Sequence, residues 1–255
     1  MLRHAALFIM SFALCGCVSE YNLATGRQET LLYGTEKEIK IGQAISRQLE
    51  QNYKLVPDRD ANERVQAIMD RLEPVADRQD VVYTVRIIDR DEVNAVSLPG
   101  GYIYVFKGLL DKIDNDDQLA GVIAHEIGHI TAKHAMKRLQ ASYGYTLLQI
   151  LAVETGSAAV TQGVNALYLT AFLAYSQQDE FEADRLAVKY TQAAGYDPQG
   201  MIRVLEILRE ESLEKVRPIN YFRTHPYPNE RIAALNTQIR GHMDFRDYLN
   251  LMGSE

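Results

Sequence analysis

The stretch DDQLAGVIAHEIGHIT, residues 116–131, decides the fold expected of this chain. Apolar residues occupy nearly every side of the helix that it predicts, so this helix should be buried, and Asp116 or Asp117 can cap its first turn. Two imidazoles and a carboxylate interrupt the apolar run near its end. Such groups cost several kcal/mol of desolvation when they are buried without a partner. The stretch therefore predicts a buried helix whose ionisable residues share a compensating ligand.

The spacing of these residues indicates what that ligand is. At about 100° per residue, His125 and His129 project about 40° from each other and one turn apart. Two imidazoles on one face can bind a single zinc ion, with Glu126 on the flank as a general base for water. Gly128 costs about 1 kcal/mol in a helix interior relative to alanine, and its presence predicts a close approach of another backbone. The pattern predicts one Zn²⁺ per chain.

The third zinc ligand should come from elsewhere in the chain. The extended metzincin pattern would need Gly and His where the sequence has Ala132 and Ala135, so that class is excluded. His134 lies about 140° around the helix from His129. It cannot reach the same metal, and we interpret it as a residue that supports a ligand or lies at the surface.

The remaining source of a third ligand is a carboxylate from the helical run YSQQDEFEADRLA, residues 175–187. Glu180 and Asp184 are four residues apart and share a face, whereas Glu182 points away from Asp184. We therefore predict Glu180 as the third ligand and Asp184 as the residue that orients a ligating imidazole. A solvated acidic helix start is the alternative interpretation of this run.

The segments before residue 116 predict helices followed by a small sheet. Helical spacing extends from Glu36 to about Tyr53, and a second helix ends before Pro74. Residues 81–88 alternate as a strand, and residues 93–97 and 102–106 read as a hairpin. The predicted fold class is α+β: a mostly helical gluzincin-type metallopeptidase with a small antiparallel sheet beside the HExxH helix.

The N-terminal segment MLRHAALFIMSFALCGC, residues 1–17, predicts export. Its apolar run of ten residues rises about 15 Å as a helix, roughly half of a ~30 Å bilayer core, so it reads as a signal peptide rather than a membrane span. Residues 14–17 resemble a bacterial lipobox, which predicts cleavage after residue 16 and a lipid on Cys17. An ordinary secretory signal with two incidental cysteines is the alternative.

We accordingly expect a signal peptide at 1–16, a lipidated N-terminus and tether at 17–35, and a metallopeptidase domain at 36–255. Residues 139–178 carry a single charged residue, Glu154. Polar residues break the apolar runs of this segment, so two helices packed over the HExxH helix are expected rather than membrane spans. An apolar lid or a patch that rests on a membrane is a further possibility.

Composition limits the partners. The chain has 27 Lys+Arg against 34 Asp+Glu, a formal charge of −7, and no Lys/Arg-rich stretch. Binding to nucleic acid needs a clustered basic surface, so no nucleic-acid partner is expected.

Four elements in order resemble the HtpX/Oma-type zinc metallopeptidases, a family that includes the CAAX prenyl proteases and the periplasmic BepA-like proteases. In chain order they are Asn94-Ala95 ahead of Pro99–Ile103, HEIGH at 125–129, the run from Glu180 to Asp184, and Thr224-His225-Pro226 followed by Arg231. The resemblance covers nearly the whole mature chain and points to the BepA-like lipoprotein branch without tetratricopeptide repeats. It implies a gluzincin fold, zinc on His125, His129 and Glu180, and Glu126 as general base.

The segment around His225 should form a stiff loop close to the zinc. Pro226 and Pro228 bias His225 and Tyr227 toward extended conformations, and Arg231 can anchor the loop through Asp184 or another acid. His225 either closes the open metal position, donates a hydrogen bond to the oxyanion, or is a structural residue.

The expected function is that of a zinc endopeptidase anchored to the bacterial envelope by its N-terminal lipid. Val18 follows the lipidated Cys, which favours the periplasmic face of the outer membrane over the inner membrane. Substrates should bind as extended strands beside the hairpin at Asn94 to Ser97, with Asn94 and Ala95 as the candidate binding residues, so unfolded or misassembled envelope proteins are the expected partners. A strand that belongs only to the core sheet is the alternative for that segment. A non-proteolytic periplasmic chaperone or assembly factor is the alternative for the whole protein.

Overall fold

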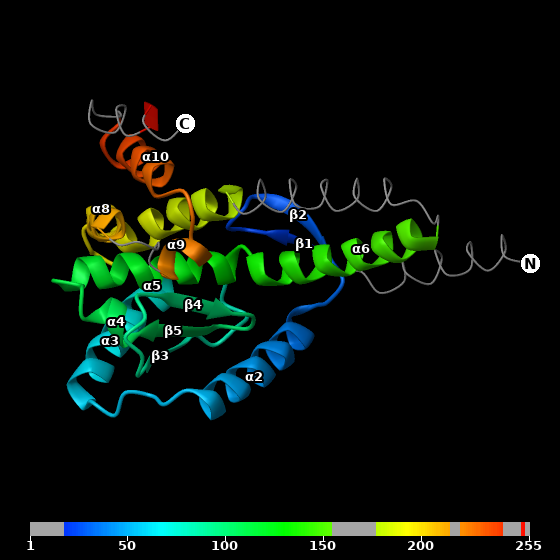
Figure 1. Ribbon diagram of the computed structural model, residues 1–255, viewed down its shortest axis with the longest axis horizontal. Helices are drawn as coiled ribbons and strands as arrows, with labels where there is room; N and C mark the ends of the chain where they lie inside the picture. The colour runs from blue at the N-terminus through cyan, green and yellow to red at the C-terminus, as the bar shows by residue number, and fades with distance from the viewer. Residues whose placement is uncertain (1–17, 155–176, 215–219, 242–250, 253–255) are drawn as a thin grey trace, which may run out of the picture.

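The computed structural model describes residues 18–154, 177–214, 220–241 and 251–252. The signal peptide and Cys17 lie outside the described residues, as do residues 155–176 of the nearly uncharged segment. Figure 1 shows the predicted HExxH helix at the centre of the molecule, with a small sheet on one side and further helices on the other. This arrangement confirms the predicted α+β, mostly helical fold class.

The central helix α5, Asp116–Thr131, is buried along almost its whole length. Its N-cap is Asn115, whose side chain accepts a hydrogen bond from the N–H of Gln118 at 3.0 Å. The cap is therefore one residue earlier than the aspartates that the sequence suggested, because Asn115 is the last residue with extended backbone angles.

The small sheet beside α5 has strand order β3-β5-β4. Strand β4, Ala95–Leu98, pairs antiparallel with β5, Tyr102–Phe106, around the predicted turn. Strand β3, Thr84–Ile88, instead pairs parallel with β5. The expectation of an antiparallel sheet is thus wrong for β3, because the hairpin folds back so that its second strand, not its first, lies beside β3. Strand β4 consequently forms the edge of the sheet nearest α5.

Helices cover both faces of this sheet. Helix α3, Arg59–Leu72, packs with α5 against the apolar face that carries Ile87 and Val105. Helix α2, Thr35–Asn52, covers the opposite face, where Leu49 packs on Ile88. A 3₁₀ turn, Glu73–Val75, ends α3 at the expected proline. The two predicted helices before the sheet are confirmed.

The second helical layer lies on the other side of α5 (Figure 1). A Cβ on Gly128 would lie 2.9 Å from the carbonyl oxygen of Ala183, in the helix over residues 177–193, so the close backbone approach predicted for this glycine is confirmed. The other helices of the described chain are α4 Lys107–Leu110, α6 His134–Glu154, α8 Gln199–Glu214, α9 Asn220–Thr224 and α10 Pro228–Arg240. Close packing of this layer brings its carboxylates to the face of α5 that carries the histidines.

Residues 18–31 differ from the expected tether. They form a hairpin of β1, Val18–Asn22, and β2, Arg27–Leu31, in which Leu31 and Asn22 are buried. Asn22 Nδ2 donates to the carbonyl oxygen of Thr131 at 3.0 Å, and Arg185 donates to the carbonyl oxygen of Ala24 at 2.6 Å. Residues 18–31 are too few and too polar to predict a strand pair from their sequence. The hairpin is instead stabilised by its contacts with α5 and with later helices.

Helix α6 also differs from the expectation that it would pack over α5. Lys133 has a left-handed backbone (φ 56°), and it breaks the helix between α5 and α6. Figure 1 shows the two helices end to end, with α6 extending away from the body. None of the helices within the described residues is sufficiently long and apolar to cross a membrane.

Candidate metal centre

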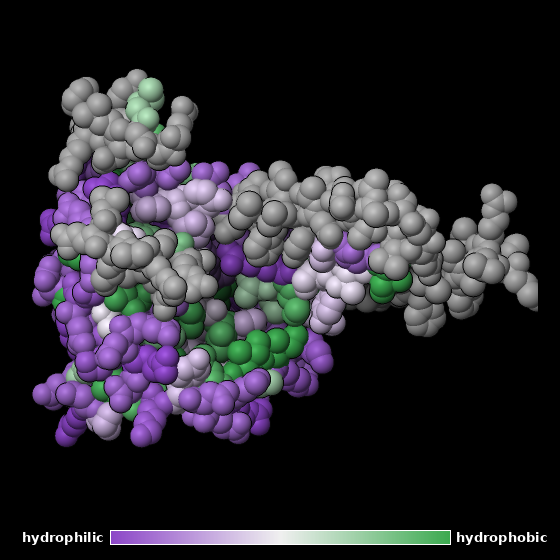
Figure 2. Space-filling model, viewed as in Figure 1, coloured by the Kyte–Doolittle hydropathy of each residue, from purple (hydrophilic) through white to green (hydrophobic). Residues whose placement is uncertain are grey.

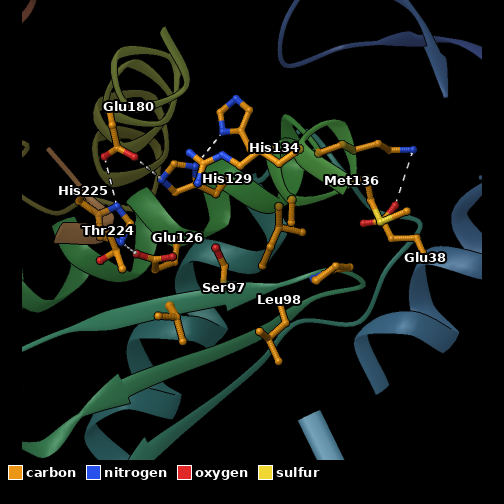
Figure 3. A pocket seen from close by; sticks show the side chains of 16 residues that line it. Glu38, Ser97, Leu98, Glu126, His129, His134, Met136, Glu180, Thr224 and His225 are labelled. Carbon is orange, nitrogen blue, oxygen red and sulfur yellow. Dashed lines mark hydrogen bonds and ion pairs between the residues drawn. The ribbon is translucent and has the colours of Figure 1, made fainter. Parts of the chain in front are cut away.

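Four buried side chains converge on one point: His125 and His129 of α5, Glu180 of the helix over 177–193, and His225 after α9. His125 Nε2 lies 3.1 Å from His129 Nε2 and 3.3 Å from His225 Nδ1. Glu180 Oε2 lies 3.3 Å from His125 Nε2 and 3.2 Å from His225 Nδ1. Figure 3 shows Glu180, His129 and His225 directed toward one another. The structure thus brings together the three predicted ligands and adds His225 as a fourth ligand-bearing group.

These residues fit a bound metal ion. With metal–ligand bonds of about 2.0–2.1 Å, tetrahedral zinc places its ligand atoms about 3.4 Å apart, close to the separations seen here. Two carboxylate oxygens of Glu126 and the Oε1 atom of Glu180 form no hydrogen bond within the described chain, although both residues are fully buried. Unsatisfied buried carboxylates are costly, and a cation among them would compensate that cost.

Asp184 and Arg231 hold His125 from the side away from the convergent atoms. Asp184 Oδ1 lies 2.9 Å from His125 Nδ1, which fixes Nε2 as the nitrogen that faces the centre. Arg231 donates to both oxygens of Asp184, at 2.7 and 2.8 Å, and its Nη1 lies 3.0 Å from Glu180 Oε2. Both expected partners therefore lie where they can orient the ligands, and Arg231 also contacts Glu180 directly.

His134 supports His129 in the same way, through a second imidazole. The two Nδ1 atoms are 2.7 Å apart, and His134 Nε2 lies 3.3 Å from Glu182 and 3.4 Å from Asp179. In a continuous helix His134 would point away from this side of His129. The left-handed backbone at Lys133 changes the helical phase and returns His134 to it. Of the two interpretations open for His134, the structure favours the supporting one.

The charges around the centre act differently on its three predicted ligands. Burial holds the pKa of His129 well below its usual value, which keeps its imidazole neutral. Burial opposes ionisation of Glu180, but the nearby His225, Arg231 and His129 hold the pKa of its carboxyl well below the usual range. Burial and Arg231 also oppose the charged form of His125, yet Asp184 and Glu180 raise the pKa of His125 to about 9.

His225 lies between the metal-facing atoms and Glu126. Its Nδ1 faces Glu180, while its Nε2 lies 3.4 Å from Glu126 Oε1 and 3.4 Å from the carbonyl oxygen of Ala95. The ring of Tyr221 stacks on it with centroids 4.7 Å apart. Sequence reasoning missed Tyr221; its place one turn before His225 in α9 was the available signal.

The backbone around His225 corrects one expectation. Tyr227 adopts a left-handed conformation (φ 65°, ψ 48°) rather than an extended one. It is the N-cap of α10, and its carbonyl oxygen accepts from the N–H of Arg231 at 3.0 Å. The left-handed residue turns the chain sharply from α9 into α10, and this reversal carries Arg231 back to the centre.

A cleft of about 180 Å³ opens beside the centre, along the edge strand β4 and the start of α6. Its lining includes Glu126, His129, Val96, Ser97 and Leu98. Figure 2 shows the hollow near the middle of the face, with apolar residues beside it. The cleft therefore joins the convergent ligand atoms to an exposed strand.

Asn94 and Ala95 lie at the end of this cleft. Asn94 Oδ1 accepts from Ala95 N at 3.0 Å and from Thr224 Oγ1 at 3.1 Å, which joins β4 to α9. The cleft is lined by the residues after this pair rather than by the pair itself. Substrate binding along residues 94–97 stays a prediction, and the cleft is lined by the second half of that range.

Comparisons with known proteins agree with this geometry. The model of peptidase family M48 matches residues 59–239. The chain is 30% identical over 223 residues to the β-barrel assembly-enhancing protease of Escherichia coli K12, covering 83% of this chain and 45% of that protein. It is 30% identical over 170 residues to the mitochondrial metalloendopeptidase OMA1 of Arabidopsis thaliana, covering 66% of this chain and 34% of that protein.

The chain spans less than half the length of these curated relatives. The family match, however, covers the HExxH helix, the helix over 177–193 and the segment through α10. Each element that contributes to the convergent centre thus falls within it. The chain belongs to peptidase family M48.

Proposed function

We propose that this protein is a zinc-dependent endopeptidase with one Zn²⁺ per chain, held by His125, His129 and Glu180. The observation that carries this proposal is the convergence of these groups beside Glu126, whose buried carboxylate makes no hydrogen bond within the described chain. A purely structural zinc site needs no such base next to it. The names of its relatives, a protease and a metalloendopeptidase, support the same activity.

The chain's own residues account for the proton transfers of peptide hydrolysis. When bound, zinc supplies Lewis acidity that polarises the scissile carbonyl and lowers the pKa of water. Glu126 accepts the proton of the attacking water and passes it to the leaving amine. Asp184 and His134 hold the two α5 imidazoles in the tautomers that direct Nε2 to the centre.

His225 sets whether the enzyme is active or latent. Its Nδ1 belongs to the convergent group, and its Nε2 approaches Glu126, so in this conformation it occupies the space that water and substrate need. Of the three roles open for this residue, the geometry favours the closing ligand. His225→Ala should raise casein cleavage. Lower turnover with metal retained would indicate an oxyanion donor instead. Unchanged turnover and unchanged metal content would contradict both the closing-ligand role and the oxyanion-donor role.

Substrate binds as an extended strand along β4. Phe106 N donates to Asn94 O, so in an antiparallel ladder residues 94, 96 and 98 face β5, and Ala95 and Ser97 face the open edge. Ser97→Pro removes one edge N–H without affecting the β5 ladder. It should reduce casein cleavage with metal content unchanged, whereas Ser97→Ala should leave cleavage intact. Equal activities of the two variants would exclude strand pairing at Ser97.

The substrates are unfolded or misassembled proteins of the bacterial envelope. A strand-binding edge requires an extended segment, which a folded chain does not present. The E. coli relative's name couples proteolysis to β-barrel assembly, which supports the envelope as the place of action. Cys17 carries the lipid that anchors the protein at the periplasmic face, with Val18 favouring the outer membrane. Cys17→Ala should release the protein into the soluble fraction.

Glu126→Gln tests the proposal directly. Metal content should stay near one zinc per chain while casein cleavage falls by roughly 10²–10⁴-fold, the usual contribution of a general base. Unchanged cleavage would refute the role of Glu126. A variant that loses cleavage yet still restores assembly of envelope proteins in cells would instead favour the chaperone alternative.

A further inference from the structure

The N-terminal hairpin leaves almost no slack between the proposed lipid anchor and the folded body. Val18 is the first residue of β1 and pairs with Leu31. Cys17 precedes it by one peptide bond, so their Cα atoms are about 3.8 Å apart. The buried residues and hydrogen bonds that fix the hairpin to α5 therefore also fix Val18, the residue that follows the proposed anchor. A lipid on Cys17 would hold one particular side of the body at the membrane.

That side includes the projecting helix α6. Gln140 accepts from Leu32 N at 3.0 Å and donates to the carbonyl oxygen of Thr30 at 3.2 Å, so the end of β2 is attached to α6. The ring of Tyr33 meets the ring of Tyr143 edge to face, with centroids 6.5 Å apart. A Cβ on Gly34 would lie 3.6 Å from Val18 Cγ2. The first residue after the anchor thus lies beside the residues that contact α6.

The outer surface of α6 suits an apolar environment. Residues 139–153 include no charged side chain. Tyr143 and Ile150 are 48% and 54% exposed, and their seven-residue spacing places them on one face of the helix. Val18, close to Gly34, is also 40% exposed. Tyrosine next to aliphatic residues is typical of a membrane–water interface.

We propose that Val18, Tyr33, Tyr143 and Ile150, the α6 face, rest on the phospholipid surface that holds the lipid of Cys17. This inference rests on the lipid anchor of the proposed function. One lipid signal alone gives weak attachment, and an adjoining apolar surface supplies the second contribution. The exposed apolar side chains are thereby explained by the same membrane that the anchor requires.

The consequence concerns substrate access. Arg138 lines the cleft and precedes Tyr143 by five residues of α6, a rise of about 7.5 Å. The cleft is therefore held beside the membrane surface rather than free in the periplasm. The polypeptides that it meets are extended segments at the lipid surface, such as chains that have failed to insert.

The absence of tryptophan from the sequence allows a direct test. Tyr143→Trp and Ile150→Trp each introduce a single tryptophan, excited selectively over the tyrosines, into the full-length, lipidated protein. The protein is reconstituted in phosphatidylethanolamine–phosphatidylglycerol vesicles with or without brominated acyl chains. Tyr53→Trp is the matched control: Tyr53 is 38% exposed at the far end of α2, about 27 Å along that helix from its start beside Tyr33. Mass spectrometry of each preparation establishes whether Cys17 carries lipid.

We expect brominated lipid to quench roughly half of the emission at positions 143 and 150 and almost none at position 53, as for side chains in an aromatic belt. Equal quenching at all three positions, or none at 143 and 150 in a lipidated protein, would overturn the inference. Blue-shifted emission of Tyr143→Trp without vesicles would also overturn the inference. A blue shift that depends on protein concentration would indicate contact with a second copy of the chain. A Cys17 without lipid would remove the anchor and this inference together, while casein cleavage, measured in parallel, reports on the peptidase separately.

Discussion

The metal centre and the Arg78 cluster both hold buried charges against the end of α5, and they are built in opposite ways. The Arg78 cluster comprises Arg78, Glu38, Asp80, Lys133 and Glu20. Arg78 donates to both oxygens of Glu38, at 2.8 and 2.9 Å, to Asp80 at 2.8 Å, and to the carbonyl oxygen of Ile130 at 3.1 Å. Although burial opposes its charge, Glu38 and Asp80 raise the pKa of Arg78 above its usual value.

The two groups differ in whether their buried carboxylates have hydrogen-bond donors. In the Arg78 cluster each carboxylate oxygen of Glu38 accepts a hydrogen bond from a cationic donor, and Glu38 also accepts from Gly100 N at 3.2 Å. In the metal centre the oxygens of Glu126 accept none within the described chain, and ligand atoms face one another at 3.1–3.4 Å. Buried charge by itself therefore indicates structure as readily as function. Ligand atoms that converge on one point, beside carboxylate oxygens that accept no hydrogen bond, indicate a binding site.

The largest effect should follow removal of a ligand from the metal centre. Glu180→Ala should weaken zinc binding and abolish casein cleavage, because the imidazoles that remain lack a carboxylate ligand and that of His225 takes the position that water needs. Glu182→Ala is the matched control: this residue contacts His134 rather than the centre, so zinc should be retained. Metal analysis after gel filtration measures both. Zinc loss in the control alone would place the ligand on the other side of the helix.

Breaking the Arg78 cluster should affect folding rather than metal binding. Arg78→Met removes both guanidinium hydrogen bonds of Glu38 and leaves it only the Gly100 amide and the ammonium of Lys133, 3.9 Å away, which should cost up to about 3–5 kcal/mol of unfolding free energy. Urea denaturation measures this loss, and zinc per folded chain should not change. Arg78→Met combined with Glu38→Leu should recover most of the stability. A double variant as unstable as the single one would show that the cluster is not a self-contained structural pair.

A smaller effect is expected from the residue that orients His125. Asp184→Asn keeps the size of the side chain but removes the charge opposite Arg231 and His125. Zinc affinity should fall about 10–100-fold, the usual cost of losing such a partner. Competition with a chromogenic chelator measures the affinity. Full affinity in this variant would mean that Arg231 and the backbone suffice to position His125.

The smallest effect should come from His134. His129 directs Nε2 to the centre, so its Nδ1 carries the proton and His134 Nδ1 accepts it. His134→Phe should weaken zinc binding about tenfold, and His134→Asn, which offers an acceptor oxygen near Nδ1, should restore part of it. The same chelator competition compares them. Identical affinities of the two variants would leave His134 with a packing role only.

Much of the fold could be predicted because its elements have strong local patterns. Helices α3 and α5 bury the apolar positions of their own spacing, and Gly128 marks the close packing of the helix over 177–193. Helix α2 forms as predicted but buries Glu38, Gly42 and Ser46 instead of its isoleucines. The polar hairpin at residues 18–31 and the parallel pairing of β3 with β5 could not be predicted in this way. Both depend on partners distant in the chain, whose positions no local pattern encodes.

The sequence alone determined which chemistry the centre can perform, because helical periodicity is local. It placed His125 and His129 on one face of α5, and Glu180 on the face shared with Asp184. Only the tertiary structure decided how that centre is supported and closed. The left-handed Lys133 resets the helical phase so that His134 reaches His129, and the sharp turn at Tyr227 brings Arg231 back to Asp184. A single backbone angle redirects all that follows it, and long-range packing selects that angle.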